Sequence, residues 1–339
     1  MNIENRINLL AATGNVLKRN LENGELDDLF FRVKNQNAWF TEQNVELALN
    51  SVVNEFFNKE KLTAWISEYD VNTSNKTVAI VMAGNIPLVG IHDLVCVFVA
   101  GYNAQVKLSS KDQVLFNFIF SIMKDLEPDL EQFIQFEEKL SGFDAVLATG
   151  SDNSKRYFEQ YFGKVPNIIR GNRNSIALIS GNETDAELEL LASDIFNYFG
   201  MGCRSVNNLI LTGNSSLEKV ISHFEKYNFV QDHHKYFNNY EYYKSIFLVN
   251  SEPHLDNGFC LFRPNYQSLV SPVSVVNYHN ISSLESIQDF IETFSNSLQC
   301  TVENGSLGLS ELRFGDTQKP SLIDYADKID VVKFLSNLN

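Results

Sequence analysis

The stretch TVAIVMAGNIPLVG, residues 77–90, decides the fold. Its first six residues form an apolar run rich in β-branched side chains, which predicts a buried strand. Gly84, Asn85 and Pro87 then predict a turn, after which Leu88–Ala100 can form a helix. The chain therefore passes from strand to helix through a short turn, as it does in an α/β unit.

The alternation of strand and helix continues along the chain. Further strands are expected at Ala104–Leu108, Asp144–Ala148 and Asn167–Ile169, and further helices at Asp112–Leu126 and Asp152–Phe162. This order predicts a parallel sheet with right-handed crossovers, in which ligands lie beyond the carboxyl ends of the strands.

A second α/β unit is expected after a junction near Gly171. Its strands are predicted at Ser175–Ile179, Asn208–Leu211, Ser245–Val249, Cys260–Phe262, Val273–Asn277 and Thr301–Glu303, and its helices at Glu183–Phe199, Leu217–Tyr227 and Ser283–Phe294. Before residue 75 the patterns are helical, with Thr41 placed as the N-cap of one helix. The chain therefore divides into a helical lead-in and two α/β units.

The composition excludes several classes of protein. The 339 residues carry a net charge of −15, which opposes binding to nucleic acid or anionic lipid. The longest apolar runs are too short to span a bilayer, and the first residues have no signal-peptide pattern. We therefore expect a cytoplasmic protein that neither binds nucleic acid nor inserts into a membrane.

Cys203 is the first candidate for chemistry. It follows an amphipathic helix and precedes an apolar strand, and Gly200 and Gly202 leave the backbone beside it open to a substrate. The alternative is a buried cysteine that serves as a small hydrophobic residue. The four cysteines are widely spaced and form no CxxC pair, so neither a metal site nor a disulfide framework is expected.

The histidines offer no clear second catalytic group. His233 and His234 lie in a charged, tyrosine-rich stretch and are expected in a surface loop. His92 lies in the apolar helix after Pro87 and is expected in the core, although its place near the presumed cleft keeps it a minor candidate.

Four short motifs follow one another in a specific order. The loop Asn85-x-Pro87 is followed by Lys107 at the end of the next strand, by Gly150-Ser151 before a helix, and by Cys203. In this order they resemble the aldehyde dehydrogenase superfamily, whose corresponding motifs are Asn-x-Pro, a strand-end lysine, Thr-Gly-Ser and Gly-Gln-x-Cys. The usual dinucleotide fingerprint GxGxxG is missing from the turn after the first strand.

Within the superfamily, the sequence RGNRNS at 170–175, the helix entry Phe40–Glu42 and the short length resemble the long-chain acyl-CoA reductases of the bacterial luminescence type. The match covers roughly residues 75–305. The resemblance implies an α/β fold with three parts, which are a helical segment over 1–74, a Rossmann-like cofactor-binding domain over 75–171 completed by 305–339, and a catalytic domain over 172–304.

The resemblance also implies a dinucleotide site. Its cofactor-binding residues would be Lys107, Ser109, Ser110, Gly150, Ser151 and Gly171. Lys107 would bind the adenosine ribose, and the Gly150-Ser151 turn would receive the pyrophosphate at a helix N-terminus. Ser110 and Lys111 leave room and positive charge for a 2′-phosphate, which favours NADP(H) over NAD(H). Without the resemblance, Lys107 reads as a solvated charge at a strand end.

Departures from the family pattern point to the reaction. Aldehyde-oxidising members carry a glutamate upstream of the cysteine that activates water, whereas residues 168–171 here read IIRG. A thioester on Cys203 would then exchange with a thiol, which implies reduction of an acyl-CoA to the aldehyde. Asn85 would donate to the oxyanion beside the Cys203 amide, unless it serves only as a turn residue. Met201 replaces the family's glutamine, and residues 268–272 read SLVSP where the family has Glu-x-Phe-Gly-Pro.

Two other functions stay open at this point. The chain could reduce an acyl phosphate, as the related glutamyl phosphate reductases do, or it could be a non-catalytic nucleotide- or acyl-binding protein in which Cys203 is structural. The expected partners are an acyl-CoA substrate, a second copy in a homodimer, and an enzyme that supplies the acyl group or accepts the aldehyde.

Overall fold

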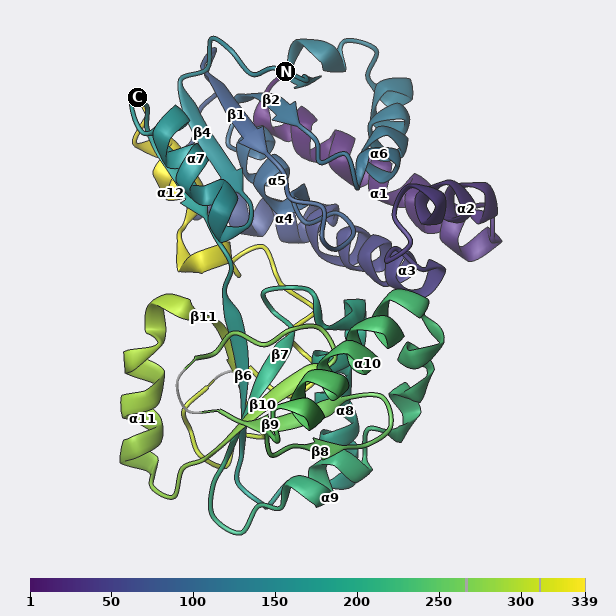
Figure 1. Ribbon diagram of the computed structural model, residues 1–339. Helices are drawn as coiled ribbons and strands as arrows, with labels where there is room; N and C mark the ends of the chain where they lie inside the picture. The colour runs from purple at the N-terminus through teal and green to yellow at the C-terminus, as the bar shows by residue number, and fades with distance from the viewer. Residues whose placement is uncertain (266–267, 311, 339) are drawn as a thin grey trace. The chain divides into compact units, whose positions relative to one another are not determined.

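The computed structural model describes residues 1–265, 268–310 and 312–338. The chain forms two compact units, of which the first contains residues 1–172 and 320–339 and the second contains residues 173–319 (Figure 1). Each unit is built on one mainly parallel sheet. Residues 305–319, which the sequence analysis grouped with the cofactor-binding part, belong to the second unit.

The sheet of the first unit has five parallel strands in the order β3-β2-β1-β4-β5. The strands are β1 (Thr77–Val81), β2 (Asn103–Lys107), β3 (Ile134–Phe136), β4 (Ala145–Thr149) and β5 (Asn167–Arg170). The order reverses at β1, because β2 and β3 lie on one side of β1 whereas β4 and β5 lie on the other. The carboxyl ends of all these strands lie at one edge of the sheet, where open α/β sheets bind their ligands.

The helices of the first unit are α1 (Ile3–Asn23), α2 (Asp27–Gln36), α3 (Glu42–Ser51), α4 (Lys59–Ile66), α5 (Ile91–Val99), α6 (Gln113–Leu126), α7 (Asp152–Phe162) and α12 (Val331–Ser336), with a π-helical turn at Val52–Phe56. The predicted cap is present, since Thr41 accepts a hydrogen bond from Asn44 N at 3.4 Å.

The helical lead-in is part of the first unit's core. Arg6 of α1 is 2% exposed and donates to the carbonyl oxygens of Phe98 and Tyr102 at the end of α5. Its guanidinium also lies over the rings of Phe98 and Phe133. The cation thus satisfies carbonyl groups at a helix C-terminus, where positive charge is favoured.

The sheet of the second unit has six strands in the order β11-β6-β7-β10-β9-β8, all parallel except that β8 runs antiparallel to β9. The strands are β6 (Asn174–Ile179), β7 (Val206–Leu211), β8 (Leu255–Asp256), β9 (Leu261–Pro264), β10 (Val275–Asn280) and β11 (Leu298–Val302). The helices are α8 (Asp185–Phe196), α9 (Leu217–Ser222), α10 (His234–Val249) and α11 (Leu284–Thr293).

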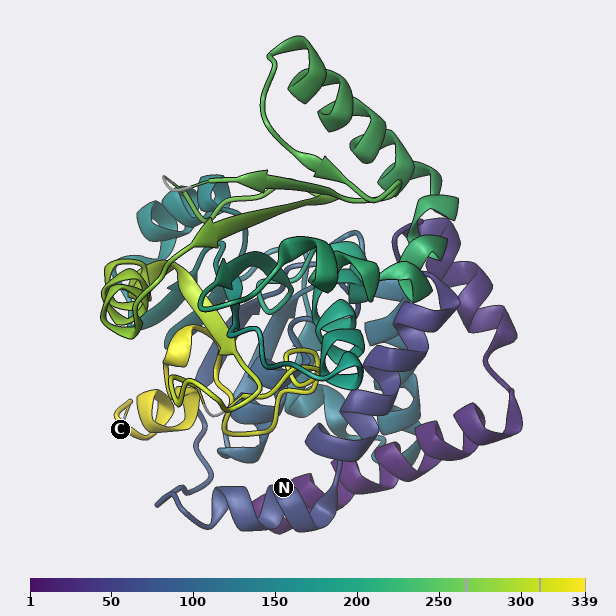
Figure 2. The same cartoon turned by 90° about the horizontal axis from the view of Figure 1, so that it is seen from below.

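The second α/β unit is confirmed, but two predictions in detail are wrong. Residues 245–249, expected as a strand, form the end of helix α10, which projects with β8 from the second unit (Figure 2). The apolar run there continues a helix whose Tyr240 and Phe247 pack on the sheet, so tertiary packing overrides the local β-propensity. His233 is the N-cap of α10 and not a loop residue, and it accepts a hydrogen bond from Tyr236 N.

The sequence analysis also missed β3, a three-residue strand at the edge of the first sheet. His92 lies where it was expected, between the rings of Phe56 and Tyr325, with Nε2 at 3.0 Å from Leu322 O. Burial lowers the pKa of this imidazole.

Candidate active site

Loops that follow four strands meet at the carboxyl edge of the first sheet. Gly84 and Ser109 lie in contact, since a Cβ at Gly84 would come within 2.5 Å of Ser109 Oγ. The loop after β1 therefore lies directly beside the loop after β2. A glycine at this point lets two backbones approach closely, which is a common feature of sites that bind phosphate groups.

The loop that carries Asn85 is fixed by a buried carboxylate that the sequence analysis missed. Leu88, at the end of this loop, has φ of 59°, and its N–H donates to Asp112 Oδ2 at 2.7 Å. Asp112 is 1% exposed, and burial raises the pKa of its carboxyl well above the usual value. Asn85 itself is exposed. The only sequence signal for Asp112 was its place at the start of a helix.

Lys107, the last residue of β2, and Ser110, on the loop after it, are exposed, and Ser109 is half-buried. Lys107 Nζ donates to Glu138 O at 2.9 Å. Gln36 of α2 fixes this loop from outside, because its amide donates to Ser110 O and accepts from Val114 N. The helical lead-in thus supports one wall of the predicted cofactor site.

The turn after β4 has the form of a helix N-terminus. Ser151 caps α7 by accepting a hydrogen bond from Ser154 N at 3.3 Å. A Cβ at Gly150 would lie 2.8 Å from Ser154 Cβ, so the turn needs a glycine. Asp152 accepts from Asn172 N at 3.0 Å, and a Cβ at Gly171 would lie 2.7 Å from Asp152 Oδ1. The structure thus brings Gly150, Ser151 and Gly171 to one place.

An ion pair is buried at the end of β5. Arg170 Nη1 lies 2.6 Å from Asp93 Oδ2 in the first turn of α5, and Arg170 is 2% exposed. Burial disfavours the charge of Arg170, but the Asp93 carboxylate more than offsets this and raises the pKa of the guanidinium. The pair ties β5 to α5, and the sequence patterns gave no sign of it.

Cys203 belongs to the second unit and lies where its strands begin. The preceding residues Tyr198, Phe199 and Gly200 all have left-handed backbones, with φ of 54°, 57° and 71°. Such a conformation costs about 1–3 kcal/mol for each residue with a side chain, so the surrounding structure must impose it. It ends α8 abruptly and turns the chain into the segment Gly202–Ser205, which we call the thiol turn.

The thiol turn holds Cys203 half-buried and free of any disulfide. Cys203 Sγ accepts a hydrogen bond from Arg173 N at 3.5 Å, and Cys203 O accepts from Ser175 Oγ at 2.9 Å. Arg204 Nε donates to Thr317 O.

A small cavity of about 20 Å³ is lined by residues that flank the thiol turn in sequence, Gly200 before it and Val206 after it. Its lining includes Phe199, Gly200, Val206, Tyr236, Cys260 and Val275. The Phe199 ring lies 4.6 Å from His233 and 5.9 Å from Tyr236, between ring centroids. The Phe199 side chain, on the left-handed turn, is thus buried beside other rings.

A buried polar network fixes the segment 268–272 on the second sheet. Asn208, Asn277 and His279 are at most 1% exposed. Asn208 Nδ2 donates to Leu269 O at 2.8 Å, Asn277 Nδ2 donates to Val270 O at 3.3 Å, and His279 Nε2 lies 3.1 Å from Asn208 Oδ1. Burial lowers the pKa of His279 to about 4, so the imidazole is neutral at pH 7.

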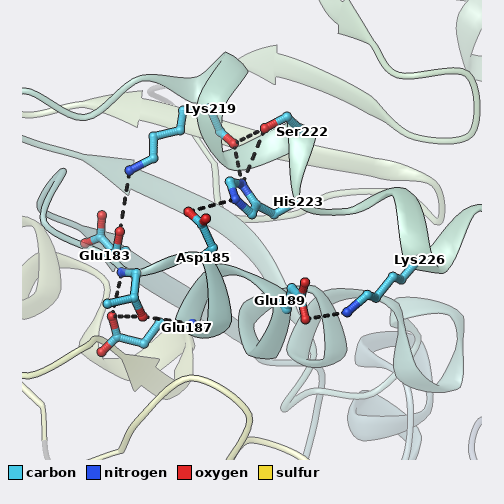
Figure 3. A network of polar contacts seen from close by, with 9 residues as sticks. Glu183, Asp185, Glu187, Glu189, Lys219, Ser222, His223 and Lys226 are labelled. Atoms are coloured by element: carbon cyan, nitrogen blue, oxygen red, sulfur yellow. Dashed lines mark hydrogen bonds and ion pairs between the residues drawn. The ribbon is translucent and has the colours of Figure 1, made fainter.

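A second polar network lies on the surface and fixes the start of α8 (Figure 3). Asp185 lies 3.1 Å from His223 Nε2, and Lys226 pairs with Glu189. Glu187 closes a capping box with Thr184. These contacts join the first half of α8, at the opposite end from the thiol turn, to α9 and the turn after it.

Comparison with solved structures identifies the architecture. Similar structures include indole-3-acetaldehyde dehydrogenase in complex with NAD+ (TM-score 0.63, 11% identity, 89% of this chain and 72% of that chain). Betaine aldehyde dehydrogenase from Staphylococcus aureus has a TM-score of 0.64 and 11% identity, covering 90% of this chain and 76% of that one. Aldehyde dehydrogenase 21 from Physcomitrella patens, solved with succinate, has a TM-score of 0.64 and 12% identity, with coverages of 91% and 79%.

The chain has an aldehyde dehydrogenase-like fold. The predicted fold class is therefore confirmed. No protein-family model matches the sequence, and no curated relative matches it by sequence. Structural similarity at such low sequence identity shows the fold alone, so the roles of individual residues stay predictions.

Two further predictions concern absences. Among the residues that the structure describes, no helix combines the length and apolar character needed to cross a bilayer. Over the same described ranges, no three His, Cys, Asp or Glu side chains are grouped so that they could hold a metal ion.

Proposed function

We propose that the protein is an oxidoreductase that reduces an acyl-CoA thioester to the aldehyde, with NADPH as reductant and Cys203 as nucleophile. The observation that carries the proposal is the combination of an aldehyde dehydrogenase-like fold with a half-buried thiol, in no disulfide, on a constrained turn. Bulky residues held in left-handed conformations mark sites where the fold sustains strain for a purpose.

The residues of the first unit suit a dinucleotide. The sheet reverses its order at β1, and the glycines at 84 and 150 are positions that a Cβ would fill. Lys107 and Ser110 would bind the adenosine ribose, and Ser151 with the N-terminus of α7 would bind the pyrophosphate. Lys111, exposed beside Ser110, favours the 2′-phosphate. When bound, the dinucleotide would supply a hydride equivalent.

The chemistry of the protein itself is thioester exchange. The Cys203 thiolate would attack the thioester carbonyl, forming a new carbon–sulfur bond, and CoA would leave as its thiolate. The Cys203 N–H and the Asn85 side chain are the proposed donors to the oxyanion. The thioacyl group on Cys203 would be reduced to a thiohemiacetal, which collapses to the aldehyde and returns the thiol.

The absence of a carboxylate base in residues 168–171 supports exchange with a thiol over hydrolysis. Arg170 is buried in an ion pair with Asp93, and none of residues 168–171 carries a carboxylate that could deprotonate water. General-base activation of water contributes about 10²–10⁴-fold to hydrolysis when present. Without it, a thioester on Cys203 would persist long enough to be reduced.

The decisive experiment follows NADPH absorbance with a panel of acyl-CoAs, comparing the wild-type protein with Cys203→Ala. We expect turnover in the wild type and a loss of at least 10³-fold in the variant, because the nucleophile is removed. Turnover that survives in Cys203→Ala would exclude the mechanism.

Parallel arms separate the other functions. An acyl phosphate that oxidises NADPH faster than any acyl-CoA would identify an acyl-phosphate reductase. Stoichiometric alkylation of Cys203 in a protein that oxidises NADPH with neither substrate would identify a binding protein. A Lys111→Glu variant tests the cofactor, and we expect KM for NADPH to rise about tenfold while KM for NADH changes little, because a phosphate contact is lost.

A further inference from the structure

Asp194 is a buried carboxylate in the last turn of α8, and its partners lie far along the chain. It is 0% exposed. Its oxygens accept hydrogen bonds from Gly315 N at 2.6 Å, Thr317 N at 3.1 Å and Thr317 Oγ1 at 2.7 Å. A carboxylate that is buried at the cost of its hydration and surrounded by neutral donors holds those donors in a fixed geometry.

The segment that Asp194 holds contacts the thiol turn directly. Thr317 O accepts a hydrogen bond from Arg204 Nε, the residue that follows Cys203. Gln318 Nε2 donates to Ser205 Oγ at 3.1 Å. The same hydroxyl oxygen accepts from Gly202 N at 3.3 Å, on the other side of Cys203. Residues 317–318 therefore contact the second half of the thiol turn directly, and they reach Gly202 only through the Ser205 hydroxyl.

The opposite side of the turn is fixed by the start of β6. Arg173 N donates to the thiol sulfur and Ser175 Oγ donates to Cys203 O. The thiol turn is thus held between two segments, β6 and residues 315–318. Residues 315–318 lie outside the sheet, and three of their donors bind the Asp194 carboxylate.

We propose that Asp194 is the positioning residue of the thiol turn, acting through residues 315–318 on the side chains of Arg204 and Ser205 and, through Ser205 Oγ, on the N–H of Gly202. The structural part of this proposal concerns the turn alone, and its consequence for turnover rests on the proposed function. Misplacing a reacting group by 1 Å costs on the order of 10²-fold in rate.

The charge on Asp194 makes the position of the thiol turn depend on pH. Burial raises the pKa of this carboxyl to about 6, against the hydrogen bonds from Gly315 and Thr317, which lower it, and Asp316 raises it further. Tyr227 is the titratable side chain that faces it from the turn after α9. Protonation below pH 6 leaves the carboxyl group a weaker acceptor for its three donors, so the thiol turn loosens as the pH falls.

Hydrogen exchange of the full-length protein tests the structural part. In Asp194→Ala, we expect a peptide covering residues 198–207 to exchange at least tenfold faster than in the wild type. Thr317→Val removes one hydroxyl donor and keeps the shape, so it provides a variant that still folds, and we expect a smaller increase in the same peptide. Thr317→Ser keeps the hydroxyl and should match the wild type.

The matched control is Asp185→Asn, which changes an exposed carboxylate on the same helix. Its exchange over 198–207 should equal that of the wild type. Unchanged exchange over 198–207 in both Asp194→Ala and Thr317→Val, or an equal increase in Asp185→Asn, overturns the proposal. This result does not depend on any reductase activity, so it is separate from the failure of the proposed function.

Kinetics supply the second measurement if acyl-CoA reduction is found. We expect Asp194→Ala to lower kcat at least tenfold while KM for NADPH stays within twofold, since the first unit is untouched. The wild-type profile of kcat against pH should show an inflection near 6 that disappears in Asp194→Asn. An inflection that persists in Asp194→Asn, or a fall in kcat that Thr317→Ser shares, contradicts the positioning role.

Discussion

The interiors of the two sheets are built on different principles. In the first, the buried side chains of the three central strands are all apolar, such as Ile80 and Leu147, each 0% exposed. In the second, Asn208, Asn277 and His279 lie within the strands and are equally buried. Apolar packing has no direction, whereas hydrogen bonds do. The second sheet can therefore specify which loop lies on it, and it selects the segment 268–272.

The largest expected effect tests these buried polar side chains of the second sheet. Asn208→Leu would leave Leu269 O without its donor and His279 Nε2 without its partner, both in the core. Each unsatisfied buried group costs about 1–3 kcal/mol, so we expect the free energy of unfolding to fall by roughly 3–4 kcal/mol. Urea denaturation measures this change in the free energy of unfolding. The matched change in the first sheet, Leu147→Met, should cost less than about 1.5 kcal/mol because volume is conserved.

A loss in Asn208→Leu no larger than that in Leu147→Met would remove the distinction between the two sheets. It would mean that the asparagine contributes only volume. A loss confined to the second unit, seen as a separate early transition, would sharpen the distinction.

The second effect is a pH dependence that the first sheet cannot show. The pKa of His279 is about 4 in the folded protein and 6.5 in the unfolded chain, so the unfolded state binds more protons between these values. The contribution of His279 to the free energy of unfolding is fully present above pH 6.5. It is lost as the pH falls towards 4, by roughly 3 kcal/mol in all, because each pKa unit corresponds to about 1.36 kcal/mol. The free energy of unfolding should therefore fall less steeply with acid in His279→Gln than in the wild type.

Asp194 contributes with the opposite sign, because its raised pKa makes the folded state hold a proton between pH 3.8 and about 6. Asp194 contributes equally to both proteins, so its contribution cancels when the free energies of unfolding of the wild type and His279→Gln are subtracted. Parallel curves of stability against pH for the two proteins would show that His279 does not titrate on unfolding.

The smallest effect is expected to be equal in the two units. Ser151 caps α7 in the first unit and Ser216 caps α9 in the second, each accepting a backbone N–H at 3.3 Å. Replacing either by alanine should lower the free energy of unfolding by about 1 kcal/mol. A cap acts on its own helix, so unequal losses would show that the surrounding sheet also matters. Thermal denaturation of the two variants gives the answer.

Much of the fold could be predicted from the sequence, and less of the site. The strand at residues 77–81 and the helix after it follow from an apolar run, a turn and a helical pattern, all local features. The prediction of a strand at the end of α10 was wrong because the apolar residues there suit a strand as well as a helix. Asp112, Asp93 and Asp194 were missed, since an isolated aspartate in a sequence does not reveal a partner that lies elsewhere in the chain.

The sequence by itself determined that there are two α/β units, and it placed the loop of Asn85, Lys107 and the Gly150 turn at the ends of parallel strands. These features depend on the periodicity of burial over a few residues, which the order of amino acids records directly. Only the tertiary structure decided that Asp194 reaches Thr317 and that Asn208 reaches Leu269. Such bonds join groups that become neighbours only when the sheet and its loops have packed, so no local pattern encodes them.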